Sequence, residues 1–416
     1  MGGHSRPDRQ RASRPTLPRS LRCGVHQQMT VAPDTNPASQ LSSEMFESPT
    51  AYAAALEAFL STDERATPYL GYRPHSLEDS AAHLTGLQAL LFDTGWSRLG
   101  WPESAGGLGG DPRFRAAMFQ TLWNLDIPIP EPFTTLEILV PVLLVFAPHL
   151  SDALLPGLLR GDDKWAQAFS EPDAGSDLAS LRTKMEPDGD GFRLSGQKVW
   201  STFGHLSQRS VLLARSGGPG HKGLTMVLVD LDQPGIEVRP IRAEDGENHF
   251  SEIFLDNAWV PADRVIGTLG QGWAIAMYML QWERGAWGWL QQGRFHQRLQ
   301  QAVELGTPNP EFAQQLGHAY ALAAALRLTT KQTVERLARE EQLGPEVSVD
   351  KLLLIDAELA TWDAIRAYLG PRFEVDDTLQ WLRHEYLFSR AAPIYGGSQE
   401  IQRTLVAQRV LGMPRD

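Results

Sequence analysis

The sequence contains a single cysteine, Cys23, among 416 residues. It lies in an N-terminal stretch without hydrophobic periodicity, so disulfides, cysteine metal sites and a cysteine nucleophile are excluded from the folded body. Long apolar runs are lacking as well. The longest, near residues 138–147, is interrupted by Pro141 and is too short to span a bilayer. We interpret it as a buried helix and expect neither a membrane partner nor a bound metal.

The nucleotide-binding fingerprint GxxxxGK[ST] is missing. The chain also lacks an excess of basic residues: its formal net charge is −12 and its sequence pI is about 5.4. An acidic chain of this kind argues against nucleic acid as the main partner. It leaves room for a local basic pocket that holds a phosphorylated ligand.

The first 28 residues are poor in acidic side chains, with Asp8 alone among several arginines. Those arginines are Arg6, Arg9, Arg11, Arg14, Arg19 and Arg22. A mitochondrial presequence has such a composition, but Pro7, Pro15 and Pro18 oppose an amphipathic helix. We favour an extension ahead of a working start at Met29. Residues 1–48 are expected to be disordered and the protein cytoplasmic, or in the mitochondrial matrix if 1–28 is a presequence.

Hydrophobic spacing divides the rest of the chain into three parts. Residues 49–163 repeat apolar side chains at helical spacing and predict an all-helical domain. Residues 164–268 alternate short strand-like runs with turns, including a hairpin at residues 188–191, and predict a small barrel or sandwich. Residues 269–416 return to the helical period, with one long helix expected over 273–299. The fold class is therefore a multidomain α+β protein.

Four segments then carry a specific pattern: AFSEPDAGSD at 168–177, GQKVWSTFG at 196–204, IFLDNAWVPADRVIGTLGQGWAIAM at 253–277, and YLFSRAAPIYGGSQEIQRTLVAQRVLGMPR at 386–415. Together, in this order, they resemble the acyl-CoA dehydrogenase family, in its bacterial form. The resemblance implies an N-terminal helical domain, a middle β-domain and a C-terminal four-helix bundle, the same order that the hydrophobic spacing gives.

The resemblance also implies a reaction. The family uses FAD and removes two hydrogens from an acyl-CoA: a carboxylate takes the α proton while flavin N5 accepts the β hydride, which gives the 2-enoyl-CoA. By match to the family motifs, several residues are expected to hold the cofactor. These are Phe169, Ser170, Ser176, Trp200, Thr202 and Ser398.

This chain departs from most members of the family at the position of the catalytic base. Most members carry a glutamate directly after the tyrosine of the C-terminal motif, where this chain has Gly396. Isovaleryl and long-chain members instead place the glutamate on the first bundle helix, before an arginine. Here Glu283 precedes Arg284 in an apolar stretch, so Glu283 is the expected base. The alternative is an ordinary Glu-Arg pair on a solvated helix face.

The same motifs give expectations for the substrate. Ser176, Arg284, Gly396 and Gly397 are expected to contact it, with the Gly396 N–H bonding the thioester oxygen. A glycine there would also leave room for a branched or bulky acyl group. The acyl chain itself, and the choice between CoA and a carrier protein, stay open at this point.

Partners and alternatives follow from the resemblance. An electron-transferring flavoprotein is the expected acceptor in fatty acid metabolism, and the chain is expected to form a homo- or hetero-oligomer, as a dimer or tetramer such as a homotetramer. Two other functions stay open: a flavin oxidase or monooxygenase on the same fold, and a non-catalytic subunit of a heterotetrameric dehydrogenase.

Overall fold

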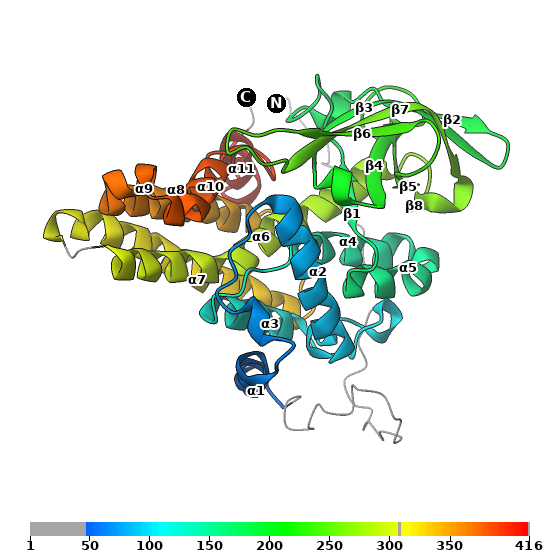
Figure 1. Ribbon diagram of the computed structural model, residues 1–416. Helices are drawn as coiled ribbons and strands as arrows, with labels where there is room; N and C mark the ends of the chain where they lie inside the picture. Colours follow the sequence, from blue (N-terminus) through cyan, green and yellow to red (C-terminus); the bar gives the residue numbers. More distant parts are fainter. Residues whose placement is uncertain (1–46, 307–308, 415–416) are drawn as a thin grey trace, which may run out of the picture.

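A computed structural model describes residues 47–306 and 309–414 of the chain. Helices come first, a β-sheet follows, and helices return (Figure 1). This order confirms the fold class inferred from the sequence. Residues 1–46, nearly all of the segment expected to be disordered, lie outside the described residues. None of the described helices is long and apolar enough to cross a bilayer.

The N-terminal helices begin at short polar residues or prolines. The side chains of Ser48, Ser76 and Asp111 each accept a hydrogen bond from a backbone N–H in the first turn of the helix that follows. The helices are α1 (Pro49–Thr62), α2 (Leu77–Asp93), α3 (Pro112–Asn124), α4 (Pro132–Phe146) and α5 (Pro148–Arg160). Helix α4 contains Pro141 and is almost entirely buried, as its apolar sequence predicts.

The strands form one sheet in the order β6-β7-β3-β2-β4-β5-β8, with β1 paired in parallel with β4. Their bounds are β1 (Trp165–Ala168), β2 (Lys184–Asp188), β3 (Gly191–Thr202), β4 (Arg209–Arg215), β5 (Leu224–Asp230), β6 (Ile236–Ile241), β7 (Phe250–Pro261) and β8 (Val265–Ile266). The predicted hairpin is confirmed: Asp188 pairs with Gly191, and Gly189 takes the positive φ of 63° that such a tight turn requires.

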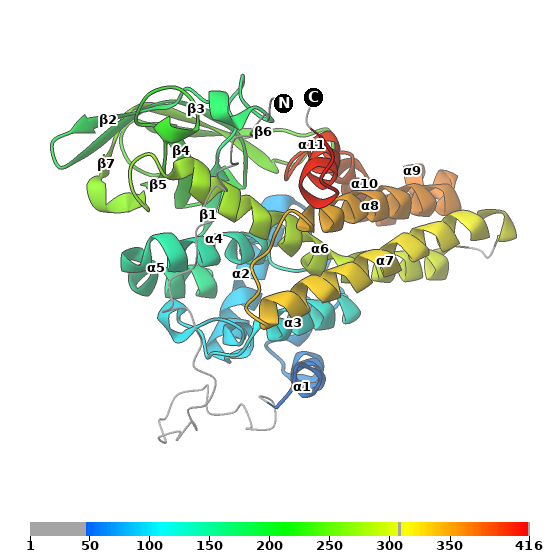
Figure 2. The ribbon, with the colours of Figure 1, turned by 180° about the vertical axis from the view of Figure 1, so that it is seen from behind.

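The C-terminal helices are α6 (Gly272–Leu305), α7 (Ala313–Ala338), α8 (Val347–Leu369), α9 (Pro371–Val375), α10 (Gln380–Ser389) and α11 (Gln399–Leu405). The long helix expected over 273–299 extends further, to Leu305. Helix α6 is central: it packs on α4, α3 and β5 and also on α7 and α8 (Figure 2). Side chains on α6 can therefore contact each of the three parts of the molecule.

Candidate active site

A cavity lies where the three parts meet. Its walls come from α4, α6 and α10, from strands β1, β3 and β7, and from the turn that precedes α11. Glu283 and Trp287 contribute from α6, Thr202 from β3, and Tyr395 from the turn. Residues from distant sequence motifs thus share one enclosed space, the usual setting for a small-molecule site.

Glu283 projects from α6 into this cavity. Burial raises the pKa of its carboxyl group, and the neighbouring charges of Arg284 and Lys351 and a hydrogen bond with Gln167 oppose that rise. Among the described residues, its Oε2 atom is buried without a hydrogen-bond partner. A carboxylate that is partly desolvated and open to a ligand has the properties of a general base.

Gly396 lies beside that carboxylate. Its φ is +64°, in the left-handed region that glycine tolerates. A Cβ atom placed on Gly396 would lie 3.4 Å from Oε1 of Glu283 and 3.6 Å from Nζ of Lys351. The sequence positions 283 and 396 therefore converge on one point in space. The turn is held by Gln402, whose Nε2 donates to the carbonyls of Gly396 and Gly397 at 3.1 and 3.2 Å.

Lys351 is a buried cation that the sequence reasoning missed. It lies on α8 and is only 1% exposed. Its Nζ donates to the carbonyl of Ala392 at 3.2 Å and stands 3.9 Å from the centre of the Tyr395 ring. Burial lowers the pKa of Lys351 to about 8, against the opposing charges of Glu358 and Glu283. The one signal in the sequence was a lysine placed directly before the apolar run of residues 352–355.

A Lys351→Met variant is expected to shift the pH dependence of catalysis. The positive charge of Lys351 lowers the pKa of Glu283, so removing the ammonium group should raise the pKa of Glu283 further. Because a base acts only when deprotonated, the acid limb of the kcat/KM profile should move to higher pH, with a severalfold loss of activity on that limb. A pH profile of kcat/KM measures the shift. The exposed lysine on α7, as Lys331→Met, is the control; an unmoved limb in Lys351→Met would contradict the coupling.

The tyrosine of the C-terminal motif is held in place through its hydroxyl group. Tyr395 donates its hydroxyl to Oε2 of Glu358 at 3.0 Å, and Arg294 donates to the other oxygen of that carboxylate at 3.1 Å. Arg294 also pairs with Glu385 at 3.2 Å. This buried network ties α6, α8 and α10 to the turn and fixes the backbone of residues 395–397 against the cavity.

Thr202 lines the cavity from β3, and Trp200, two residues before it, lies against the cavity-lining ring of Phe250. The register between β3 and β7 shifts between Lys198 and Ser201, and Trp200 sits in that irregularity with φ +63°. Its indole is 59% exposed and makes a T-shaped pair with the ring of Phe250, with 5.9 Å between the ring centroids. An uncovered aromatic face next to the Thr202 hydroxyl fits a ligand with a flat apolar body and polar edges, such as an isoalloxazine ring.

Other residues that we expected to contact the cofactor or the substrate do not line this cavity. Phe169 is 5% exposed and packs into the hydrophobic core, so its ring does not face the cavity. Ser170 is half-buried, and Ser176 is exposed in the turn that follows. Ser398 caps α11, accepting from Ile401 N–H at 3.5 Å. Neither Ser176 nor Arg284 lines the cavity among the described residues.

A second buried ion pair holds the loop that carries Ser170. Lys198 is fully buried on β3, and its Nζ donates to Oε1 of Glu171 at 2.8 Å and to the carbonyl of Phe169 at 3.1 Å. The Glu171 carboxylate also accepts the backbone N–H groups of Arg182 and Thr183. These bonds lower the pKa of Glu171, while burial lowers that of Lys198 to about 8.

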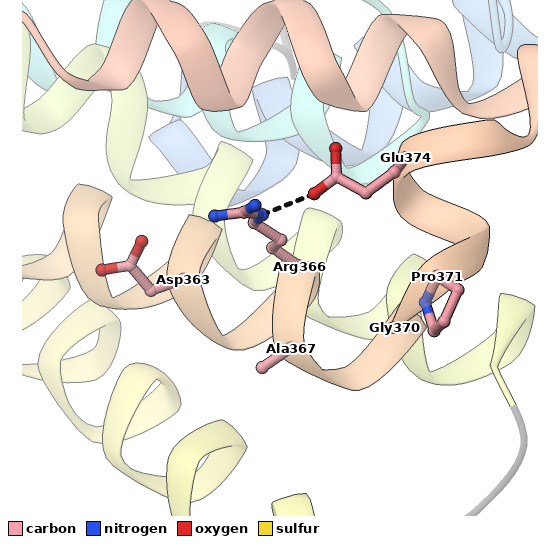
Figure 3. A pocket seen from close by; sticks show the side chains of 6 residues that line it. All are labelled: Asp363, Arg366, Ala367, Gly370, Pro371 and Glu374. Atoms are coloured by element: carbon pink, nitrogen blue, oxygen red, sulfur yellow. Dashed lines mark hydrogen bonds and ion pairs between the residues drawn. The ribbon is translucent and has the colours of Figure 1, made fainter.

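A shallow hollow at the end of α8 contrasts with the cavity (Figure 3). Its charged groups are already paired: Arg366 donates to Glu374 at 2.8 Å, and Asp363 accepts from Arg390 at 3.0 Å. No residue of the four sequence motifs lines it. We assign it no role in the chemistry.

Comparison with known proteins agrees with this arrangement. The acyl-CoA dehydrogenase middle-domain model matches residues 166–258, and the C-terminal-domain model matches residues 270–411. Acyl-CoA dehydrogenase IpdE1 of Mycobacterium tuberculosis is 39% identical over 340 residues, which cover 78% of this chain and 87% of that protein. Cyclohexane-1-carbonyl-CoA dehydrogenase of Geobacter metallireducens is 30% identical over 285 residues, 65% of this chain and 74% of that protein.

Solved structures share the fold. The Tcur3481-Tcur3483 steroid ACAD superimposes with a TM-score of 0.77 at 24% identity, over 88% of this chain and 98% of that chain. The identity over most of the IpdE1 sequence, the two domain matches and the exposed aromatic surface beside a buried carboxylate agree with one another. The chain belongs to the acyl-CoA dehydrogenase family of FAD-dependent oxidoreductases.

Proposed function

We propose that this chain catalyses α,β-dehydrogenation of an acyl-CoA thioester, with Glu283 as the base that removes the α proton. The observation that carries the proposal is the Glu283 carboxylate, which lines a cavity and whose Oε1 lies beside Gly396. Its raised pKa reflects a site where a proton can be held after transfer. FAD, when bound, supplies the acceptor for the β hydride.

The turn at Gly396 supports polarisation of the thioester. Its backbone is fixed by Gln402, and the missing side chain leaves the space in front of Glu283 free. In our proposal the Gly396 N–H donates to the thioester oxygen as negative charge develops there during proton removal. Thr202 and Trp200 would hold the isoalloxazine edge and face, and the Gln167 amide faces the same space.

Anaerobic addition of a panel of acyl-CoA thioesters tests the proposal. The flavin absorbance should bleach with at least one of them, and the product should be the 2-enoyl-CoA by mass, two hydrogens lighter. A cyclic acyl group such as cyclohexane-1-carbonyl-CoA, named in one relative, belongs in the panel. Failure of every thioester to bleach a flavin-loaded protein would contradict the proposal.

The electron acceptor and the assembly form a second part of the proposal. We infer an electron-transferring flavoprotein as acceptor; rapid reoxidation in air with release of peroxide would favour an oxidase instead. A Tcur3481-Tcur3483 pair in a structural relative suggests two unlike chains. Purifying this chain alone and recording its colour and mass distinguishes a self-sufficient homo-oligomer from one that needs a second subunit.

A Trp200→Ala variant is expected to lose FAD. Removing the exposed indole deletes the flat apolar surface beside Thr202, which should weaken FAD binding by about tenfold. The flavin-to-protein absorbance ratio after gel filtration measures the loss. Trp200→Phe keeps an aromatic face and should retain most of the flavin. Equal flavin content in both variants would contradict this role for Trp200.

A further inference from the structure

Helix α4 presents one face to the active-site cavity, and that face changes character along its length. The cavity-lining residues are Glu131, at the N-cap of α4, and Thr134, Thr135, Ile138 and Leu139 of the helix itself. Their spacing places them on a single side of the helix. The end that begins the helix is polar and the other end is apolar. A cavity that binds only a hydrocarbon chain is expected to be apolar along its whole length.

The polar end has hydrogen-bonding groups without protein partners. Among the described residues, the side chains of Glu131, Thr134 and Thr135 make no hydrogen bond, and Glu131 forms no ion pair. Burial raises the pKa of Glu131 to about 7, against the opposing charge of Arg294. Covering these groups with hydrocarbon would leave them unsatisfied and would oppose binding.

The polar end lies away from the proposed base. Helices α4 and α6 run in opposite directions: the rings of Phe146 and Tyr278 meet at 5.3 Å near one end, while Glu131 interacts electrostatically with Arg294 toward the other. On α6, Glu283 lies between Tyr278 and Arg294. Arg294 lies 11 residues beyond Glu283 on α6 (294 − 283), a rise of roughly 16 Å. Glu131, which interacts with Arg294, therefore lies toward the end of the cavity away from Glu283.

We propose that Glu131, with Thr134 and Thr135, binds a hydroxyl group at the end of the acyl moiety remote from the thioester. The natural substrate is then an oxygenated acyl-CoA and not a plain fatty acyl-CoA. This inference rests on the proposed dehydrogenation and adds its substrate class. An anionic end group would be repelled by the Glu131 carboxylate, and the guanidinium of Arg294 is already paired with Glu358 and Glu385. An uncharged hydroxyl can donate to Glu131 and accept from a threonine.

The test uses matched pairs of straight-chain acyl-CoA thioesters with eight, ten and twelve carbons, each with and without a terminal hydroxyl. Anaerobic flavin bleaching gives kcat/KM for each compound. At one length or more, the hydroxylated thioester should be preferred by about tenfold, since its absence leaves buried polar groups unpaired. Glu131→Leu should reverse that preference, and the near-isosteric Glu131→Gln should keep part of it.

Controls separate a specific role from damage to the fold. Glu57→Leu changes an exposed carboxylate on α1 in the same way and should keep the wild-type preference. Flavin content and the thermal midpoint report whether each variant is folded. If no thioester bleaches the flavin, the dehydrogenation fails; the hydroxyl preference is then read from Kd, by quenching of tryptophan fluorescence. Equal affinity for both members of every pair, or a preference that survives in Glu131→Leu, overturns the inference.

Discussion

A Glu283→Gln variant is expected to keep its FAD and lose about 10³-fold in the rate of flavin bleaching by substrate. The amide keeps the size and polarity of the side chain but cannot accept the α proton, and a positioned general base contributes roughly 10²–10⁴-fold. Single-turnover bleaching under anaerobic conditions measures the loss. Glu346→Gln, a carboxylate near the start of α8 outside the cavity, is the matched control.

A second carboxylate should restore part of the lost activity. Because a Cβ on Gly396 would begin 3.4 Å from Oε1 of Glu283, a glutamate at 396 can reach the same space. The double variant Glu283→Gln/Gly396→Glu should bleach its flavin faster than Glu283→Gln alone. Recovery will be incomplete, since a side chain at φ +64° costs roughly 1–2 kcal/mol. A single Glu283→Gln protein that bleaches at the wild-type rate would remove Glu283 from the mechanism.

The outline of the site could be predicted because its motifs are local. The long helix that carries Glu283 is visible in the apolar spacing, and the glycine at 396 marks a missing carboxylate within a recognisable segment. Ser398 caps α11, and its expected role in holding the cofactor stays a prediction. What these positions share is that a few neighbouring residues determine their structure.

Other parts of the site depend on contacts between distant segments. Glu131 immediately precedes α4 in a non-helical segment, and only the packing of α4 on α6 places it at the cavity. Phe169 carried a family motif, but it follows the last residue of β1 and points into the core. Lys198 and Lys351 were ordinary lysines in the sequence. Their burial follows only from packing against Glu171 and Tyr395, 27 and 44 positions away.

A Lys198→Met variant is expected to have the largest effect on stability. Methionine fills a similar volume but leaves the Glu171 carboxylate without its cation and the carbonyl of Phe169 without its donor. Removing one partner of a buried ion pair typically costs roughly 3–5 kcal/mol. Chemical denaturation followed by tryptophan fluorescence measures the free energy of unfolding. Lys184→Met, at an exposed position of β2, should change it by less than about 0.5 kcal/mol.

The double variant Lys198→Met/Glu171→Gln separates loss of charge balance from loss of packing. A neutral amide at 171 can still accept from the N–H of Thr183, so no buried charge is left unpaired. Stability should recover by a large part of the single-variant loss, because replacing both ions of a buried pair is often nearly neutral. If the double variant is instead less stable than Lys198→Met, the ion pair is not what holds this loop. Flavin content is expected to follow stability in this series, because the loop that Lys198 fixes to β3 carries Ser170 directly beside Phe169.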